Sequence, residues 1–285
     1  MKLARYTYNN RTSVGLVADG RIYDIPAALP HVPANIREIF AAGRGMLDEI
    51  ARELPGARKG LALDEVRLEA PINDPQKYMA IGMNYHDHAE EARAAGIPIP
   101  TTQLWFNKQV SCITGPYHPV VKPKVSDRLD YEAEMGVVIG KRCRYVSEAD
   151  ARSVVAGYFV SNDMTARDWQ AASPTFTLGK SFDTHGPIGP WIVTDDEIED
   201  PHDLEMRLSV NGEPRQKSST GGMIYNIWQQ ISHLSQVMTL EPGDLIATGT
   251  CANVGIALDK FLQPGDVVRV EIDKLGHIEN TIVDE

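Results

Sequence analysis

The stretch DYEAEMGVVIG, from Asp130 to Gly140, places two glutamates one residue apart in what otherwise reads as a β-strand. Because side chains alternate along a strand, Glu132 and Glu134 share one face and their neighbours take the other. Two carboxylates side by side repel each other, and each raises the pKa of the other. A strand tolerates such a pair on a water-facing surface or beside a positive group, so both a solvated face and a metal site remain open.

Composition limits the classes of partner. The chain has 285 residues, 42% of them hydrophobic, which is enough for a substantial core, and its net charge is −11 at pH 7. A strongly acidic chain is a poor partner for nucleic acid, because phosphate contacts need clustered Lys and Arg. No apolar run reaches the roughly 18 residues that a membrane span needs. The start, MKLARYTYNN, has no apolar signal-peptide region. We therefore expect neither nucleic acid nor a membrane among the partners.

The cysteines and the absent motifs exclude several more classes. The three cysteines lie far apart and form no CxxC pair, which argues against a disulfide framework and a structural zinc site, and fits a reducing, cytoplasmic location. The sequence contains no GxGxxG, GxxxxGK[ST], HExxH or GxSxG motif. The absence of these motifs therefore disfavours nucleotide-cofactor, P-loop, zincin and serine-hydrolase functions.

Short β-like segments separated by Gly, Pro, Asn and Asp follow one another from about Lys77 onward. Asp19-Gly20 and Asn211-Gly212 are the dipeptides of tight hairpin turns. Helical spacing occurs in residues 34–53, where two glycines interrupt it, and in residues 225–238. Strands and helices do not alternate strictly, so a doubly wound parallel sheet is not expected. The pattern predicts a mostly β chain with a few helices and a small module in the first 70 residues.

A third carboxylate is needed if the pair holds a metal. Glu132 and Glu134 offer hard oxygen ligands, which Mg²⁺ and Mn²⁺ prefer, but two carboxylates rarely suffice for a dedicated site. Asp163 is the best candidate, because it ends a strand-like run and enters a polar turn. The spacing of 29 positions from Glu134 to Asp163 allows a neighbouring strand without proving one.

A second constellation lies in GMNYHDHAEEARAAG, which predicts a helix with Asp87 as a possible cap. His88 and Glu91 are three residues apart, so they share one face of that helix. A carboxylate beside an imidazole orients the ring and raises its basicity, which suits a general base that activates water. A chance pair on an exposed helix is the alternative. His86 and His88 read as a zinc pair only with further ligands, and none follows at ligand spacing.

Donor side chains form a third group. Arg167 and Gln170 follow Asp163 closely, and Lys180 lies in a segment rich in Gly and Pro. Together they can donate hydrogen bonds to a carboxylate or to a developing oxyanion, although for Lys180 taken alone a surface lysine beside a turn is the favoured interpretation. Thr250 belongs to a segment of small and hydroxyl residues that is either a pocket-lining loop or a tight strand connection.

Six segments, in their order along the chain, together resemble the fumarylacetoacetate hydrolase family: GMNYHDHAEE, DYEAEMGVVIGK, SNDMTARDWQ, GKSFDTHGPIGPW, VNGEPRQ and LEPGDLIATGT. The similarity runs from about Tyr78 to the C-terminus. It implies a mostly β (α+β) fold with a catalytic domain in residues 71–285, whose mixed sheets roll around the active site. It also implies a small N-terminal α+β domain in residues 1–70, and usually a homodimer.

The resemblance implies roles for the candidate residues. In that family an ExE pair and a later Asp hold one Mg²⁺ or Mn²⁺ per subunit, and here these are Glu132, Glu134 and Asp163. The family's His and Glu, which activate water on a mobile lid, fall on His88 and Glu91. Its three donors around the oxyanion fall on Arg167, Gln170 and Lys180. Its Thr near the substrate carboxylate falls on Thr250. One departure is Cys251, where members often have Pro, and this puts the substrate in doubt rather than the metal site.

The expected activity is hydrolysis of the C3–C4 bond of a small 2,4-dioxo acid, which would release pyruvate and a carboxylic acid. The expected cofactor is the metal alone. Alternatives with related chemistry are an oxaloacetate-type decarboxylase, a hydroxymuconate-type isomerase or decarboxylase, and a lyase acting on a ureido acid. A non-enzymatic binding module is a remote alternative, which loss of a carboxylate or of the lid pair would favour.

Overall fold

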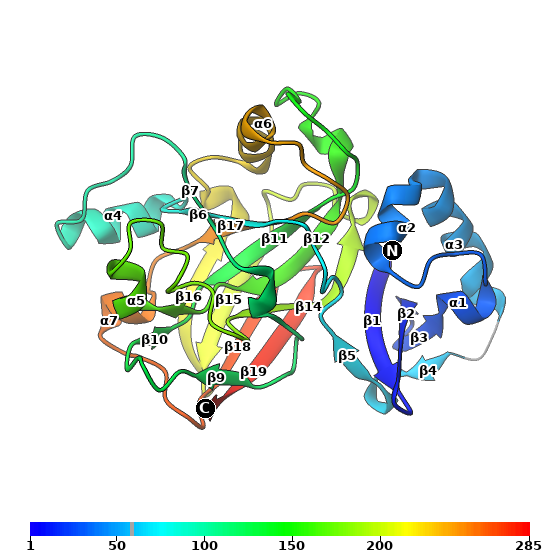
Figure 1. Ribbon diagram of the computed structural model, residues 1–285, viewed down its shortest axis with the longest axis horizontal. Coiled ribbons are helices and arrows are strands. Elements are labelled where there is room, and N and C mark those ends of the chain that lie inside the picture. Colours follow the sequence, from blue (N-terminus) through cyan, green and yellow to red (C-terminus); the bar gives the residue numbers. More distant parts are fainter. Residues whose placement is uncertain (58–59) are drawn as a thin grey trace.

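The computed structural model describes residues 1–57 and 60–285, and its largest element is one mixed sheet (Figure 1). In sheet order the strands of its main path are β4 (Leu61–Ala62), β3 (Arg21–Asp24), β2 (Arg11–Ala18), β1 (Lys2–Tyr8), β14 (Gly186–Thr194), β12 (Val155–Asn162), β11 (Ala133–Ile139), β17 (Leu245–Thr250), β6 (Tyr78–Gly82) and β7 (Leu104–Asn107). Two short strands lie off this path: β5 (Arg67–Glu69) pairs with β1, and β8 (Ile113–Thr114) pairs with β14. The β17–β6 and β14–β8 pairs are parallel, whereas β11 is antiparallel to both its neighbours.

The described residues form two smaller sheets as well. One has the order β16 (Glu213–Ser219), β15 (Glu205–Val210), β18 (Val267–Ile272), β19 (Gly276–Asp284) and β9 (Val120–Lys122). The other joins β10 (Leu129–Asp130) to β13 (Thr165–Ala166). The expectation of a mostly β chain with mixed sheets, rather than a doubly wound parallel sheet, is therefore confirmed.

The helices lie around the edges of the sheets (Figure 1). They are α1 (Ile25–Ala28), α2 (Ile36–Ala42), α3 (Arg44–Ala57), α4 (His86–Ala94), α5 (Arg167–Ala171), α6 (Ile227–Val237) and α7 (Gly255–Leu258). Short 3₁₀ turns occupy Leu63–Glu65, Val110–Cys112, Ala151–Val154, Asp195–Glu197 and Thr220–Gly222. None of the helices in the described residues is long and apolar enough to cross a membrane.

Strand β11, the centre of the opening stretch, is buried along its whole length. Side chains on one face, such as Met135 and Val137, join a core shared with β15, β18 and β19. Val138 on the opposite face belongs to a second core, which also contains Phe159 of β12 and apolar residues of the N-terminal strands. Gly136 leaves room for the Phe159 ring, because a Cβ there would lie 2.1 Å from it. This double burial holds β11 between two layers.

The two predicted hairpin turns are confirmed. Asp19 (φ 49°) and Gly20 (φ 72°) join Ala18 to Arg21 in the β2–β3 hairpin, and Asn211 (φ 53°) and Gly212 (φ 78°) do the same for β15 and β16. These positive φ angles match the two-residue turn that favours Asn, Asp and Gly. The helical pattern of residues 34–53 divides into α2 and α3 at Gly43, whose φ is 85°.

The N-terminal residues do not form a separate sheet. Strand β1 is antiparallel to β14, with Lys2 opposite Val193 and Leu3 opposite Ile192. Strands from both sides of residue 70 thus belong to one sheet. The boundary between two domains at that residue stays a prediction. Figure 1 shows α1 to α3 at one end of the molecule and α4, α5 and α7 at the other.

Candidate active site

The three predicted carboxylates come together at the ends of β11 and β12. These strands pair with Ala133 opposite Asn162, and Asp163 N donates a hydrogen bond to the Glu132 carbonyl at 2.9 Å. Glu132, Glu134 and Asp163 are all buried, and each contributes an oxygen to a group whose members lie within 4.8 Å of one another. The neighbouring-strand arrangement suggested by the 29-residue spacing is therefore the observed one.

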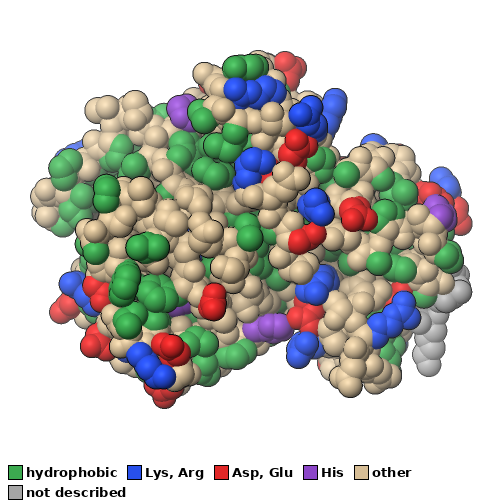
Figure 2. Space-filling model, in the orientation of Figure 1, with side chains coloured by type: hydrophobic (Ala, Val, Ile, Leu, Met, Phe, Trp, Pro, Cys, Tyr) green, Lys and Arg blue, Asp and Glu red, His purple; other side chains and the backbone are tan. Residues whose placement is uncertain are grey.

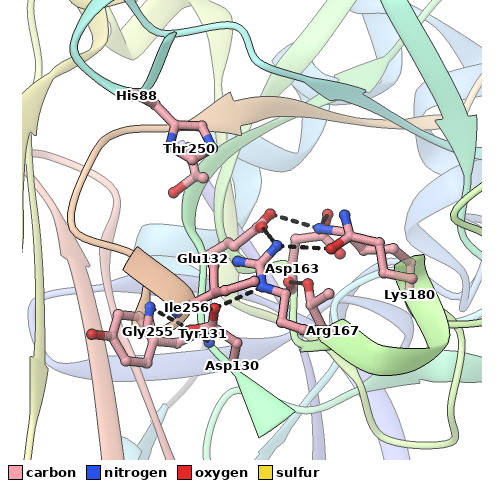
Figure 3. Close-up of polar contacts among 12 residues, drawn as sticks. His88, Asp130, Tyr131, Glu132, Asp163, Arg167, Lys180, Thr250, Gly255 and Ile256 are labelled. Carbon is pink, nitrogen blue, oxygen red and sulfur yellow. Dashed lines mark hydrogen bonds and ion pairs between the residues drawn. The ribbon is translucent and has the colours of Figure 1, made fainter. Parts of the chain in front are cut away.

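Three buried cations neutralise most of this negative charge. Lys180 Nζ donates to Glu132 Oε2 at 2.7 Å and to Asp163 Oδ2 at 2.8 Å. Lys108 Nζ donates to Asp163 Oδ1 at 2.6 Å and also to the Lys180 carbonyl. Arg167 Nη1 lies 2.8 Å from Glu132 Oε1, and Figure 3 shows its guanidinium between Asp130 and Glu132. The positive groups that the glutamate pair requires are thus supplied partly by the protein itself.

The pKa values of the carboxyl groups differ with their partners. Burial raises the pKa of Glu134 well above its usual range, and the nearby Asp163 and Glu132 raise it further. Burial would also raise the pKa of Asp163, but Lys108 and Lys180 outweigh it, so that pKa is lowered. Glu134 is therefore the member of the group that most lacks a positive partner.

The donor set fits a hard divalent cation. All three side chains offer carboxylate oxygens, which Mg²⁺ and Mn²⁺ prefer. Each carboxylate has about four lone-pair positions, so Glu132 and Asp163 can accept from the lysines and still bind an ion. Glu134 Oε2 accepts from Gly249 N at 2.9 Å, which leaves its other oxygen for a cation. Within the described residues Glu134 has no ion pair with a lysine or arginine, unlike Glu132 and Asp163, so an added positive charge would stabilise this carboxylate most.

Asp130 supports the site from below. Its buried carboxylate accepts Arg167 Nε at 2.7 Å and the backbone N–H groups of Gly255 at 2.6 Å and Ile256 at 2.9 Å (Figure 3). The aspartate therefore joins the start of α7 to the guanidinium that contacts Glu132.

Helix α4 carries the predicted water-activating pair, His88 and Glu91. His88 Nδ1 lies 3.0 Å from Glu91 Oε2, and Glu91 Oε1 accepts the backbone N–H of Asn253 at 2.9 Å. Burial would raise the pKa of Glu91, but the hydrogen bonds from His88 and Asn253 N lower it overall. The prediction that Asp87 caps the helix is wrong: Tyr85 is the N-cap residue, and Asp87 lies in the first turn, where it accepts His88 N at 2.7 Å.

A cavity of about 430 Å³ unites these groups. Its lining includes eight of the nine predicted site residues: His88, Glu91, Glu132, Glu134, Arg167, Gln170, Lys180 and Thr250. Asp163 is not among them.

Three donors remain available toward this space. Arg167 Nη2 is buried and makes no hydrogen bond within the described residues. Gln170 Oε1 accepts Arg167 Nη1 at 3.0 Å, which directs the Gln170 amide NH₂ to the other side. The Lys180 ammonium has three N–H groups and gives one each to Glu132 and Asp163. These groups can together stabilise an oxyanion.

Thr250 has a more structural environment than the resemblance implies. Its hydroxyl donates to the Ala133 carbonyl at 2.8 Å and accepts Gln216 Nε2 at 3.0 Å. It would donate to a substrate carboxylate only after giving up the bond to Ala133.

Sequence reasoning missed four residues: Lys108, Asp130, Gln216 and Asn253. Asp130 carried a usable signal, because it continues the same alternation as Glu132 and Glu134. Lys108 follows β7 and reads as a surface lysine, although the structure buries it completely. Gln216 links Ala133 N of β11 to Thr250 of β17, and Asn253 binds Glu91 through its backbone, so no local pattern reveals either.

Comparisons with known proteins agree with this geometry. A family model described as "Fumarylacetoacetate (FAA) hydrolase C-terminal" matches residues 77–283. A mitochondrial oxaloacetate tautomerase of Xenopus laevis is 41% identical over 277 residues, which cover 96% of this chain and 86% of the relative. A 2,4-didehydro-3-deoxy-L-rhamnonate hydrolase of a Sphingomonas species is 42% identical over 281 residues, with 97% and 94% covered. Maleylpyruvate hydrolase from Sphingobium sp. SYK-6, solved with manganese(II) and pyruvate, matches with a TM-score of 0.81 at 34% identity and covers 100% of this chain and 99% of that one.

Proposed function

The chain belongs to the fumarylacetoacetate hydrolase family, and on that premise we propose that it is a divalent-metal-dependent hydrolase of a small 2,4-dioxo acid. The reaction would cleave the C3–C4 bond and release pyruvate and a carboxylic acid. The observation that carries this proposal is the His88–Glu91 pair, which lines the same cavity as Glu132, Glu134 and the oxyanion donors. A hydrolase needs such a base to activate water.

Glu132, Glu134 and Asp163 would hold one Mg²⁺ or Mn²⁺ ion. A bound ion would supply Lewis acidity that polarises the 2-oxo acid end of the substrate. The manganese(II) and pyruvate in the Sphingobium relative support such an ion, without distinguishing the two metals here. Lys180 and Arg167 would keep the Glu132 carboxylate oriented at the same time, through their contacts at 2.7 and 2.8 Å.

His88 would take a proton from water while Glu91 holds the ring through Nδ1. The Asn253 N–H fixes the second oxygen of Glu91, so the pair is oriented from two sides. The hydroxide would attack the C4 carbonyl, and Arg167 Nη2, Gln170 Nε2 and the third N–H of Lys180 would stabilise the oxyanion. General base assistance typically contributes about 10²–10⁴-fold and each oxyanion donor about 10²–10³-fold. Thr250 would act on the substrate carboxylate only after its hydroxyl rotates.

A direct test combines two variants with a matched control. Glu132→Gln should abolish acylpyruvate cleavage with both Mg²⁺ and Mn²⁺. His88→Ala should reduce kcat by about 10²–10⁴-fold while metal affinity stays near wild type. His86→Ala, an exposed histidine on the same helix, should leave both unchanged. Full activity of Glu132→Gln would refute the metal assignment, and equal loss of metal binding in His88→Ala would make His88 a ligand.

A second candidate is enol–keto conversion or decarboxylation of oxaloacetate. The Xenopus laevis relative favours the enol–keto conversion, since that protein is an oxaloacetate tautomerase. His88 would then move a proton at C3 and no water would attack. Assays of acylpyruvates, oxaloacetate and dioxo sugar acids on one preparation would separate the candidates. The homodimer and the cytoplasmic location remain part of the proposal, and light scattering would test the first.

A further inference from the structure

The wall of the active-site cavity is mainly apolar. Fourteen of its 23 lining residues have apolar side chains, which come from β6, β7, α4, the segment after α4, the α5 region and the α7 region. Ionisable side chains are confined to the six that the proposed chemistry uses. The volume of about 430 Å³ falls within the range of about 300–1,000 Å³ typical of ligand pockets, so a substrate with a tail beyond its 2,4-dioxo head fits.

Neither the lysine nor the arginine of this lining has an unopposed charge for a second carboxylate, and their free N–H groups are the ones assigned above to the oxyanion. Lys180 is shared between Glu132 and Asp163, at 2.7 and 2.8 Å. Arg167 lies 2.7 Å from Asp130 and 2.8 Å from Glu132, so two carboxylates already oppose its single charge. His88 is paired with Glu91. The lining residues that the structure describes therefore supply no cation whose charge is unopposed.

The apolar wall begins beside the charged cluster and continues to the mouth. Lys180 Nζ lies 5.1 Å from the centre of the Phe106 ring, and Phe106 meets Phe176 edge to face at 5.9 Å. Leu104 lies two residues before Phe106 in β7, on the same face of the strand, and is half-buried. At the mouth, Ile97 and Ile256 line the cavity with 48% and 42% of their surfaces exposed. Figure 2 shows hydrophobic side chains gathered over the α4, α5 and α7 end of the molecule.

We propose that this cavity selects 2,4-dioxo acids whose 4-acyl tail is apolar, such as alkyl or aryl acylpyruvates, and discriminates against substrates with a second carboxylate in the tail. The inference rests on the proposed hydrolase function and names its substrate class. A tail carboxylate would lose its water against Leu104, Phe106 and Phe176 and gain no free cation, which is unfavourable. Each methylene buried against that wall instead improves transition-state binding by up to about fourfold.

Matched substrates test the selection. Cleavage of 2,4-dioxooctanoate should be more efficient than cleavage of 2,4-dioxooctanedioate by about 10²-fold or more in kcat/KM, since the two differ only in a terminal methyl or carboxylate. Within the alkyl series from acetylpyruvate upward, the catalytic efficiency should rise until the tail reaches the mouth. Equal or better cleavage of the dicarboxylate would overturn the proposal.

A binding measurement separates this proposal from the hydrolase function. Calorimetry with Mn²⁺ would compare 2-oxohexanoate with 2-oxohexanedioate, which share the 2-oxo acid head and cannot be cleaved between C3 and C4 by the proposed route. Tighter binding of the monocarboxylate supports the apolar-tail site. If no acylpyruvate is hydrolysed by the same protein, that second result refutes the hydrolase function and leaves the apolar-tail site standing. Equal or tighter binding of the dicarboxylate refutes the apolar-tail site, whatever the hydrolysis assay shows.

A charge placed on the wall should reverse the preference. Leu104→Arg puts a guanidinium on an edge strand at a half-buried position, and the ratio of catalytic efficiency on the dioate to that on the octanoate should rise by at least about tenfold. Leu104→Gln is the matched control, which is polar without a charge and should weaken the alkyl substrate without improving the dioate. If the two variants change the ratio equally, the tail does not lie along this wall.

Discussion

Replacing Lys108 with Met would remove a positive charge from beneath the three-carboxylate cluster. The Lys108 and Asp163 side chains are both fully buried, and their charged atoms lie 2.6 Å apart. Methionine keeps an unbranched apolar chain but leaves Asp163 with Lys180 alone. Removing one partner of a buried ion pair typically costs about 3–5 kcal/mol. For a chain of this size that free energy corresponds to a fall in Tm of about 6–20 °C.

The same substitution should strengthen metal binding. Lys108 raises the positive potential at Asp163, so its removal takes away a charge that repels a divalent cation. We expect Mn²⁺ to bind Lys108→Met about tenfold more tightly than wild type, a coupling of about 1.4 kcal/mol. Because a ligand that binds only the folded state stabilises it, Mn²⁺ should raise the Tm of both proteins, and that of the variant by more.

The assay is thermal and urea unfolding in chelator and in saturating Mn²⁺, with calorimetric titration of the metal. Lys122→Met is a matched control, because Lys122 contacts Asp127 at 3.0 Å but that carboxylate is 97% exposed. The control should change stability by less than about 1 kcal/mol. A metal-free Lys108→Met protein as stable as this control would refute the ion-pair reasoning. Weaker Mn²⁺ binding by Lys108→Met would refute the charge balance proposed for the site.

Three further outcomes are expected. Gly179→Ala should lower kcat/KM by about 10²-fold, because the added Cβ would lie 2.3 Å from Gln170 N and displace the segment that carries the Gln170 donor. Gly45→Ala is the control: its Cβ meets no atom within 4 Å, so activity should stay unchanged. Burial lowers the pKa of His185 to about 4, so as the pH falls below about 6.5 the unfolded chain binds the proton before the folded chain does. The free energy of unfolding therefore falls with pH. Denaturant titrations should show the wild type losing about 2 kcal/mol more of it than His185→Gln between pH 7 and pH 5. A loss equal to that of His185→Gln would contradict this burial effect. Asp130→Asn should cost about 2–3 kcal/mol in urea unfolding and reduce kcat, because it replaces an acceptor of a charged hydrogen bond, and an unchanged kcat would show that this aspartate does not orient the guanidinium.

Features that depend on neighbouring residues were predictable from the sequence. The Asp19-Gly20 and Asn211-Gly212 turns follow from backbone angles that few other dipeptides adopt. The shared face of Glu132 and Glu134 follows from alternation, and the contact between His88 and Glu91 follows from helical spacing.

Features that depend on tertiary pairing were not predictable. Lys108 comes directly after a short edge strand, a position where lysine is normally exposed. Its burial is explained by contacts with the Asp163 carboxylate, 55 residues away, and with the Lys180 carbonyl. Arg167 and Lys180 were expected to face the substrate, and no local pattern shows that both also bind Glu132. The Asp87 cap failed because Tyr85 has extended backbone angles and precedes the helix, so the aspartate is already inside the first turn.

The pairing of β1 with β14 has a consequence for biosynthesis. Lys2 and Leu3 find their partners Val193 and Ile192 about 190 residues later, whereas the other half of β1 is already covered by β5 from Arg67 to Glu69. At translation rates of about 5–20 residues per second, those two residues wait about 10–40 s for their neighbours. During that time the nascent chain presents a short unpaired strand edge, and Lys2, which carries a positive charge there, opposes pairing with another nascent chain.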